Sequence, residues 1–79
     1  MSFNIKISDG KGNIKNLSVT KTDTISSAKI AAGYTPTTNY KWKTDGQVLK
    51  DEKTIEFYDI EKDDLIVVSK NQVGGEFYK

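Results

Sequence analysis

Apolar and polar residues alternate along two segments near the start of the chain, and this period of two is typical of strands with one buried face. The first strand begins at Phe3, and the second is centred on Leu17 and Val19. The glycine-rich segment 9–13 between them predicts a hairpin turn. Ile14 has the wrong parity for the second strand. Either a bulge shifts the register there, or the Ile14 side chain is exposed.

A short alanine-rich segment, residues 25–32, carries apolar residues at helical spacing. The preceding residues 22–24 offer side chains that cap helix N-termini, and Gly33 suits the C-terminal cap. We therefore predict a helix of about two turns, which is too short to be stable unless it packs against a sheet.

Three more strands are expected in the second half of the chain. Residues 40–44 alternate in the same way, an Asp-Gly pair marks a tight turn, and residues 47–49 form a short return strand. Residues 55–60 predict an irregular turn, with 3₁₀ geometry as one form, and the apolar run 65–68 is typical of a central strand. The order ββαβββ, with one helix on one face of a mixed sheet, predicts an α+β domain of two layers.

The composition argues against catalysis and metal binding by this chain. Its 79 residues include no cysteine and no histidine, which removes disulfides, thiolate zinc ligands, thiol nucleophiles and imidazole bases. Asp63 and Asp64 adjoin, but we interpret them as a solvated turn rather than an acid–base pair. We therefore expect one domain that is not an enzyme and holds neither a metal nor a cofactor.

The charges nearly cancel, since 12 basic residues face 11 acidic ones for a net charge of +1. Such a balance gives no reason to expect nucleic acid or a membrane surface as a partner. No apolar run approaches the ~20 residues that span a bilayer, and the first residues lack the order of a signal peptide. We expect a cytoplasmic monomer.

The second half of the chain resembles the ubiquitin family. Residues 45–55 are similar to the family's turn, short strand and following Thr-Leu pair, and residues 58–62 resemble its Tyr-Asn-Ile-Gln-Lys segment. The two sequences run side by side without a gap over 40–75, and residues 22–25 resemble the helix-start motif. Between 25 and 40 this chain is a few residues shorter. The resemblance implies a β-grasp fold, with a mixed sheet packed against one short helix.

The position of Gly74 and Gly75 carries the functional part of this resemblance. The pair follows the last predicted strand by a few polar residues, where the family presents its reactive carboxylate. Glycine suits that place because a chain without Cβ atoms passes through a narrow enzyme channel. The resemblance implies a protein modifier. An activating enzyme that uses ATP and a conjugating enzyme join the glycine carboxylate to amines of target proteins.

Four residues follow the glycine pair: Glu76, Phe77, Tyr78 and Lys79. In the family such an extension marks a precursor that a processing protease cuts after the second glycine, and the alternative is an inert tail. The predicted organisation is a folded domain over 1–70, a flexible conjugation tail over 71–75 and a removed extension over 76–79.

The recognition surface departs from that of ubiquitin. Ubiquitin's patch centres on an isoleucine and a valine, and the matching residues are Lys43 and Ser69. Val67 replaces the patch histidine, and Leu65 points outward if the register holds. These two side chains form either a different patch or ordinary apolar surface. We therefore expect ubiquitin's usual binding domains to lose their anchor.

The tail and one position that holds a linkage lysine in ubiquitin also differ from that protein. Asn71 and Val73 stand where ubiquitin has arginines, which argues against recognition by ubiquitin's own activating enzyme. The chain is therefore either a modifier with its own enzymes or a divergent modifier. Gln47 matches ubiquitin's best-known linkage lysine, and Lys62 matches another one. Lys62 is thus the candidate acceptor for chain formation, with a solubilising surface charge as the alternative.

Two aromatic residues receive structural interpretations. We predict Trp42 in the core because its position points inward. Tyr58 matches a tyrosine of the family whose hydroxyl bonds to the backbone, so we predict a hydrogen bond to the chain near Lys50.

Two other functions remain open for a β-grasp domain with this tail. A sulfur carrier also uses an adenylated Gly-Gly end, although such carriers usually stop at the glycines. A non-covalent ubiquitin-like binding domain needs no processing, and its glycine pair would be accidental.

Overall fold

The computed structural model describes residues 1–70 of the chain. Strands β1 (Ser2–Ser8) and β2 (Ile14–Thr20) form an antiparallel hairpin. Ile14 pairs directly with Ser8, the register is regular along the hairpin, and the Ile14 side chain is exposed. The structure therefore decides between the two alternatives for this residue in favour of exposure.

Helix α1 (Ile25–Ala31) is one residue shorter than predicted, because Ala32 is its C-cap. The Thr24 hydroxyl accepts a hydrogen bond from the Ser27 backbone amide, which satisfies a free donor of the first turn. At the other end Gly33 has a φ of 90°, and the amide of Tyr34 donates to the carbonyl of Lys29. This pattern is a Schellman motif, so Gly33 ends the helix as the sequence predicted.

The second half of the domain contains the predicted strands and two short 3₁₀ helices. These are η1 (Thr37–Asn39), β3 (Tyr40–Thr44), β4 (Gln47–Val48), η2 (Glu56–Tyr58) and β5 (Leu65–Lys70). Asp45 and Gly46 both have positive φ, which is the type I′ geometry of a two-residue hairpin. The irregular turn predicted over 55–60 contains η2, and β5 extends two residues beyond the apolar run.

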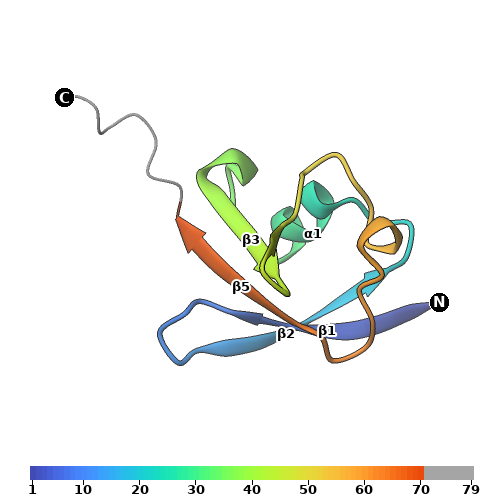
Figure 1. Cartoon of the computed structure of the whole chain (residues 1–79), viewed down its shortest axis with the longest axis horizontal. Coiled ribbons are helices and arrows are strands. Elements are labelled where there is room, and N and C mark those ends of the chain that lie inside the picture. The colour runs from blue at the N-terminus through green and yellow to red at the C-terminus, as the bar shows by residue number, and fades with distance from the viewer. Residues whose placement is uncertain (71–79) are drawn as a thin grey trace.

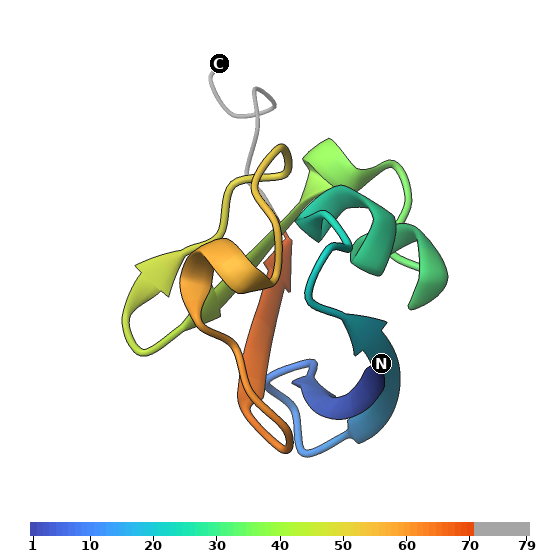
Figure 2. The same ribbon diagram turned by 90° about the vertical axis from the view of Figure 1, so that its right-hand side faces the viewer.

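The five strands within residues 1–70 belong to one mixed sheet of order β2-β1-β5-β3-β4 (Figure 1). The first and last strands are parallel neighbours at its centre, and the other pairs are antiparallel. Helix α1 packs across one face of this sheet, as the turned view shows (Figure 2). The α+β class, the ββαβββ order and the β-grasp arrangement predicted from the sequence are thus confirmed.

The core lies between α1, η2 and the inner face of the sheet. Its members are apolar residues with at most 8% of their surface exposed: Ile5, Ile7, Val19, Ile25, Ala28, Ala32, Trp42, Leu49, Ile55, Ile60, Ile66 and Val68. Trp42 is fully buried, as predicted, and packs edge-on against Tyr34 with ring centroids 5.9 Å apart. Burying an isoleucine of this kind stabilises the fold by about 1.5–3 kcal/mol.

One charged residue lies within this core. Lys29 on α1 is only 3% exposed. Its ammonium donates hydrogen bonds to the carbonyls of Thr37 and Tyr40 and forms an ion pair with Asp51. The buried charge is therefore fully coordinated, and it joins α1 to the two loops on either side of the β3–β4 hairpin.

Helix α1 has seven residues, and no helix within residues 1–70 has the length and apolarity of a membrane span.

Candidate functional site

Strand β5 places its side chains alternately on the two faces of the sheet. Ile66 and Val68 point into the core, so Leu65, Val67 and Ser69 point to the outer face, away from α1. This confirms the outward direction predicted for Leu65 and Val67, whose exposed fractions are 45% and 41%.

The pairing of β3 with β5 brings the predicted recognition residues together. Lys43 lies directly opposite Val67, and Lys41 lies opposite Ser69. Because Trp42 between the two lysines points inward, both lysines lie on the outer face. The positions that hold the apolar anchors of ubiquitin's patch thus carry an ammonium group and a hydroxyl group, on adjacent strands and diagonal to each other.

On the other side of β5 the register continues the same face onto β1. Ser8 lies opposite Val67, and Lys6 lies opposite Leu65. The Lys6 ammonium reaches the amide oxygen of Asn16 on β2 at 3.4 Å. The residues predicted for recognition are therefore part of a larger surface, and Lys6 is a member of it that the sequence reasoning missed. Its alternation with Ile5 and Ile7 was the available signal.

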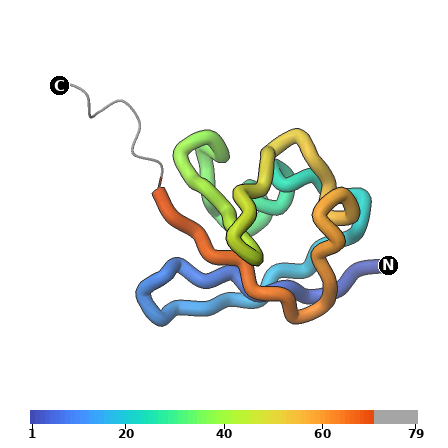
Figure 3. The backbone as a smooth tube through the Cα atoms, viewed as in Figure 1, coloured from blue at the N-terminus to red at the C-terminus, as the bar shows by residue number. Residues whose placement is uncertain are grey.

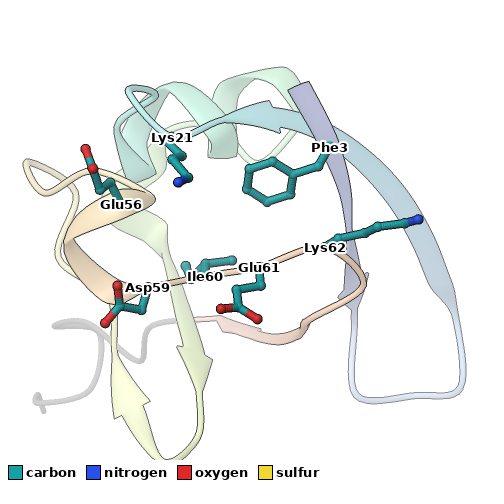
Figure 4. Close-up of a pocket in the computed structure, with 7 residues that line it drawn as sticks. All are labelled: Phe3, Lys21, Glu56, Asp59, Ile60, Glu61 and Lys62. Atoms are coloured by element: carbon teal, nitrogen blue, oxygen red, sulfur yellow. The ribbon is translucent and has the colours of Figure 1, made fainter. Parts of the chain in front are cut away.

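Lys62 lies apart from that surface, in the turn before β5. It lines a groove of about 350 Å³ together with Phe3, Lys21, Glu56, Asp59, Ile60 and Glu61. In Figure 4 the side chain of Lys62 extends away from the groove, whereas the ammonium of Lys21 points toward its centre. Lys62 is exposed, so its amine is accessible to solvent.

Tyr58 holds the connection between β4 and β5 in place. Its hydroxyl accepts a hydrogen bond of 2.8 Å from the backbone amide of Lys50, as the sequence predicted. The ring of Phe57 stands edge-on to that of Tyr58 at 5.0 Å, and the Lys53 ammonium lies 4.6 Å from the Phe57 centroid. Tyr58 is thus a structural residue.

The remaining site predictions lie outside the described residues. They concern Asn71, Val73, Gly74, Gly75, Glu76, Phe77, Tyr78 and Lys79. Strand β5 ends at Lys70, at the opposite end of the molecule from the N-terminus (Figure 3). The domain boundaries at 70 and 75 stay predictions.

A comparison with protein families matches residues 3–73 to the Ubiquitin family. The chain belongs to the ubiquitin family. The match covers α1 and all of the sheet except Ser2, so the resemblance seen in the second half extends over the first half as well. No curated protein matches this sequence closely.

Membership in the ubiquitin family bears on two predictions, that the chain is not an enzyme and that it has partners. The family consists of non-catalytic proteins, so this ubiquitin-family chain is not an enzyme. Membership also implies interactions of the kind found in the ubiquitin pathway in general.

Proposed function

We propose that this ubiquitin-family chain is a protein modifier, processed after Gly75 and conjugated through the Gly75 carboxylate to amines of target proteins. The observation that carries the proposal is the place of the glycine pair. The family match runs to residue 73, and Gly74 and Gly75 follow it directly. The sheet ends at Lys70, so a few residues separate the folded strand from the reactive carboxylate.

The chemistry of the modifier divides between the chain and its partners. A processing protease hydrolyses the peptide bond between Gly75 and Glu76 and leaves a free carboxylate. An activating enzyme joins that carboxylate to AMP from ATP with release of pyrophosphate, and an enzyme cysteine then displaces AMP to form a thioester. A conjugating enzyme passes the acyl group to a target lysine, whose amine displaces the thiolate. We place these steps in the cytoplasm.

In these steps the enzymes recognise the chain through the outer face of the sheet and the tail. The proposed contact residues are Lys43, Leu65, Val67, Ser69, Asn71 and Val73. Five of them, Lys43, Val67, Ser69, Asn71 and Val73, differ in charge or polarity from their ubiquitin counterparts. This supports activating and conjugating enzymes distinct from those of ubiquitin. Lys62, exposed and aimed away from its groove, is the proposed acceptor if the modifier forms chains.

The test is incubation of the full chain with ATP and a lysate of the source organism, followed by intact mass measurement and non-reducing gels. We expect loss of residues 76–79 and ATP-dependent adducts, both absent from Gly75→Ala. As a matched control, Lys79→Ala changes only the released segment, so it should yield the same trimmed product and the same adducts.

Two results would support the other functions of a β-grasp domain. Exchange of one terminal oxygen for sulfur on the trimmed chain would identify a sulfur carrier. An unchanged mass without adducts, in a lysate that conjugates ubiquitin normally, would leave a non-covalent binding domain as the function and overturn the proposal.

A further inference from the structure

The chain contains two Asp-Gly pairs, Asp9-Gly10 and Asp45-Gly46, and each lies in the turn of a hairpin. In such a pair the carboxyl carbon of the aspartate can bond to the backbone nitrogen of the glycine and close a five-membered ring. Glycine favours this reaction because it has no Cβ to shield its nitrogen. The two pairs are alike in sequence, but they differ in their hydrogen bonds.

Both reacting groups of the first pair are held in hydrogen bonds. One carboxylate oxygen of Asp9 accepts from the backbone amides of Lys11 and Asn13 at 2.7 and 3.2 Å, and the other accepts from the Asn13 side chain at 2.8 Å. The Gly10 amide donates to the Ser8 hydroxyl at 3.1 Å. The bonds from Asn13 and Lys11 also hold the pKa of Asp9 below its ordinary value of 3.8, and the ionised carboxylate that they favour is the poorer electrophile.

The second pair has none of these bonds. Within residues 1–70 neither the Asp45 carboxylate nor the Gly46 amide takes part in a hydrogen bond or an ion pair. Both residues are exposed, and they line a hollow of about 510 Å³ that leaves room for the ring. Gly10 and Gly46 both have open space where a Cβ would stand, so the hydrogen bonds and not the access distinguish the two pairs.

Backbone conformation and the next residue single out Asp45 among the aspartates. Asp45, Asp59 and Asp63 have positive φ, a region that residues with a Cβ adopt at a cost. Asp59 and Asp63 are followed by isoleucine and aspartate, whose side chains shield the backbone nitrogen. Asp45 therefore combines a strained backbone with an accessible nitrogen.

We propose that Asp45 is a modification site, at which the aspartate of the β3–β4 turn converts spontaneously to isoaspartate with water as the only co-reactant. In the first step the Gly46 backbone nitrogen attacks the protonated carboxyl group of Asp45. A bond forms between that nitrogen and Cγ of Asp45. The proton of the nitrogen and the hydroxyl of the carboxyl group leave together as water.

Water then opens the ring at one of its two carbonyl carbons. Cleavage of the bond between the nitrogen and Cγ restores aspartate. Cleavage of the bond between the nitrogen and the original main-chain carbonyl carbon of Asp45 leaves isoaspartate, whose main chain runs through Cβ and Cγ and whose former carbonyl is a free carboxylate. No atom is gained or lost overall, so the mass of the chain is unchanged while its main chain gains one carbon.

The extra main-chain carbon changes the turn. A two-residue turn of type I′ matches the twist of the strands that it joins, and a longer main chain between them does not. The modification should therefore break the pairing of Thr44 with Gln47 and of Lys43 with Val48. Because Lys43 is one of the proposed contact residues, isoaspartate should also weaken recognition of the chain. This last consequence rests on the proposed function, whereas the isomerisation does not.

The test keeps the purified full chain in warm neutral buffer over several weeks. An isoaspartyl methyltransferase with labelled S-adenosylmethionine methylates the new carboxylate, and peptide mapping assigns it to each aspartate. We expect isoaspartate to form at Asp45 about tenfold faster than at Asp9, because hydrogen bonds to a carboxylate must first break at Asp9. In the same chain unfolded by urea, the two rates should agree within about twofold.

Matched variants separate the hydrogen bonds from the sequence. Asn13→Ala removes the side-chain donor to Asp9 and should speed isomerisation there about threefold or more, with no change at Asp45. Asp45→Glu keeps the charge, but its longer side chain cannot close the five-membered ring, so most of the methyl incorporation should disappear. The ¹⁵N amide signals of the separated isoaspartate form should shift over residues 43–48. Urea unfolding followed by Trp42 fluorescence checks that each variant is folded.

Three outcomes would overturn the proposal: equal rates at Asp9 and Asp45 in the folded chain, a difference between them that persists in urea, or an isoaspartate form whose signals over 43–48 match those of the unmodified chain. The Gly75→Ala chain separates this result from the proposed function. It should isomerise at the unmodified rate while forming no adducts. A chain that conjugates normally while Asp45 stays unmodified disproves the isomerisation alone.

Discussion

The ammonium of Lys29 lies 2.6 Å from a carboxylate oxygen of Asp51. Lys29 is on α1 and Asp51 is 22 residues later, in the loop after β4. The same ammonium donates to the carbonyls of Thr37 and Tyr40. One side chain thus holds α1, the loop before β3 and the loop after β4 together. Its contribution to folding is therefore measurable by removing either partner.

Replacing Lys29 with methionine keeps most of the side-chain volume but leaves Asp51 and two carbonyls without their donor. We expect a loss of about 2–4 kcal/mol in the free energy of unfolding, because partly buried acceptors then lack partners. Urea unfolding followed by Trp42 fluorescence measures the loss. Lys50→Met, at an exposed lysine, is the matched control and should stay within about 0.5 kcal/mol of the unmodified chain. Equal stability of the two variants would contradict this role of Lys29.

Tyr58→Phe removes only the hydroxyl that accepts from the Lys50 amide. We expect a loss of about 1 kcal/mol, since the amide then loses its bond within the protein. The ring contact with Phe57 remains in this variant. Tyr40→Phe removes a hydroxyl whose loss should change the stability by less than about 0.5 kcal/mol, and thermal unfolding of both variants side by side gives the comparison.

Gly33→Ala tests the helix end. Nothing lies within 4 Å of an added Cβ, so the cost comes from the φ of 90° alone. We expect a loss of about 1–2 kcal/mol for alanine and less for Gly33→Asn, because asparagine tolerates the left-handed region. Equal losses for the two variants, measured by urea unfolding, would show that backbone conformation is not the cause.

Asp9 gives the fold a pH dependence in the acid range. The hydrogen bond from the Asn13 side-chain amide, followed by that from the Lys11 backbone amide, holds the pKa of Asp9 below its ordinary value of 3.8. A lowered folded pKa stabilises the protein above that ordinary value, and the contribution is lost as pH falls through the folded pKa.

The stability difference between the unmodified chain and Asp9→Asn should therefore be largest near neutral pH and shrink below pH 3.8. Urea unfolding of both proteins at several pH values measures this difference. A difference that stays constant, or grows toward low pH, would show that the carboxylate bonds in the hairpin turn do not favour the folded state.

Restoring the apolar anchors should convert the face toward that of ubiquitin. In Lys43→Ile with Ser69→Val, a domain that binds ubiquitin through those two side chains gains about 1.5–3 kcal/mol for each side chain that it buries. We expect titration calorimetry to show binding for the double variant and little or none for the unmodified chain. Gly75→Ala, with its face unchanged, should behave like the unmodified chain.

The sequence was sufficient for the architecture because period-two patterns and turn residues act locally. The sequence did not decide whether Ile14 lies in a bulge or is exposed, because both give the same pattern. The register of the β1–β2 hairpin shows that it is exposed. Lys29 could not be predicted as buried, because its three acceptors come from residues 37, 40 and 51 and meet only in the folded chain. The same holds for the neighbours on the outer face, such as Lys43 and Ser8 on either side of Val67, which follow only from the strand registers.

The parallel pairing of β1 with β5 has a consequence for how this protein is made. These central strands are the first and last of the domain, so their contacts, from Lys6–Leu65 to Ser8–Val67, span almost the whole chain. A ribosome delivers the N-terminal strand first and the strand that completes the sheet last. Until β5 has left the exit tunnel, the β1 edge of the nascent β1–β2 hairpin is therefore unpaired and its apolar face is uncovered. A chain whose synthesis stalls before β5 therefore cannot form the central β1–β5 pair of the sheet.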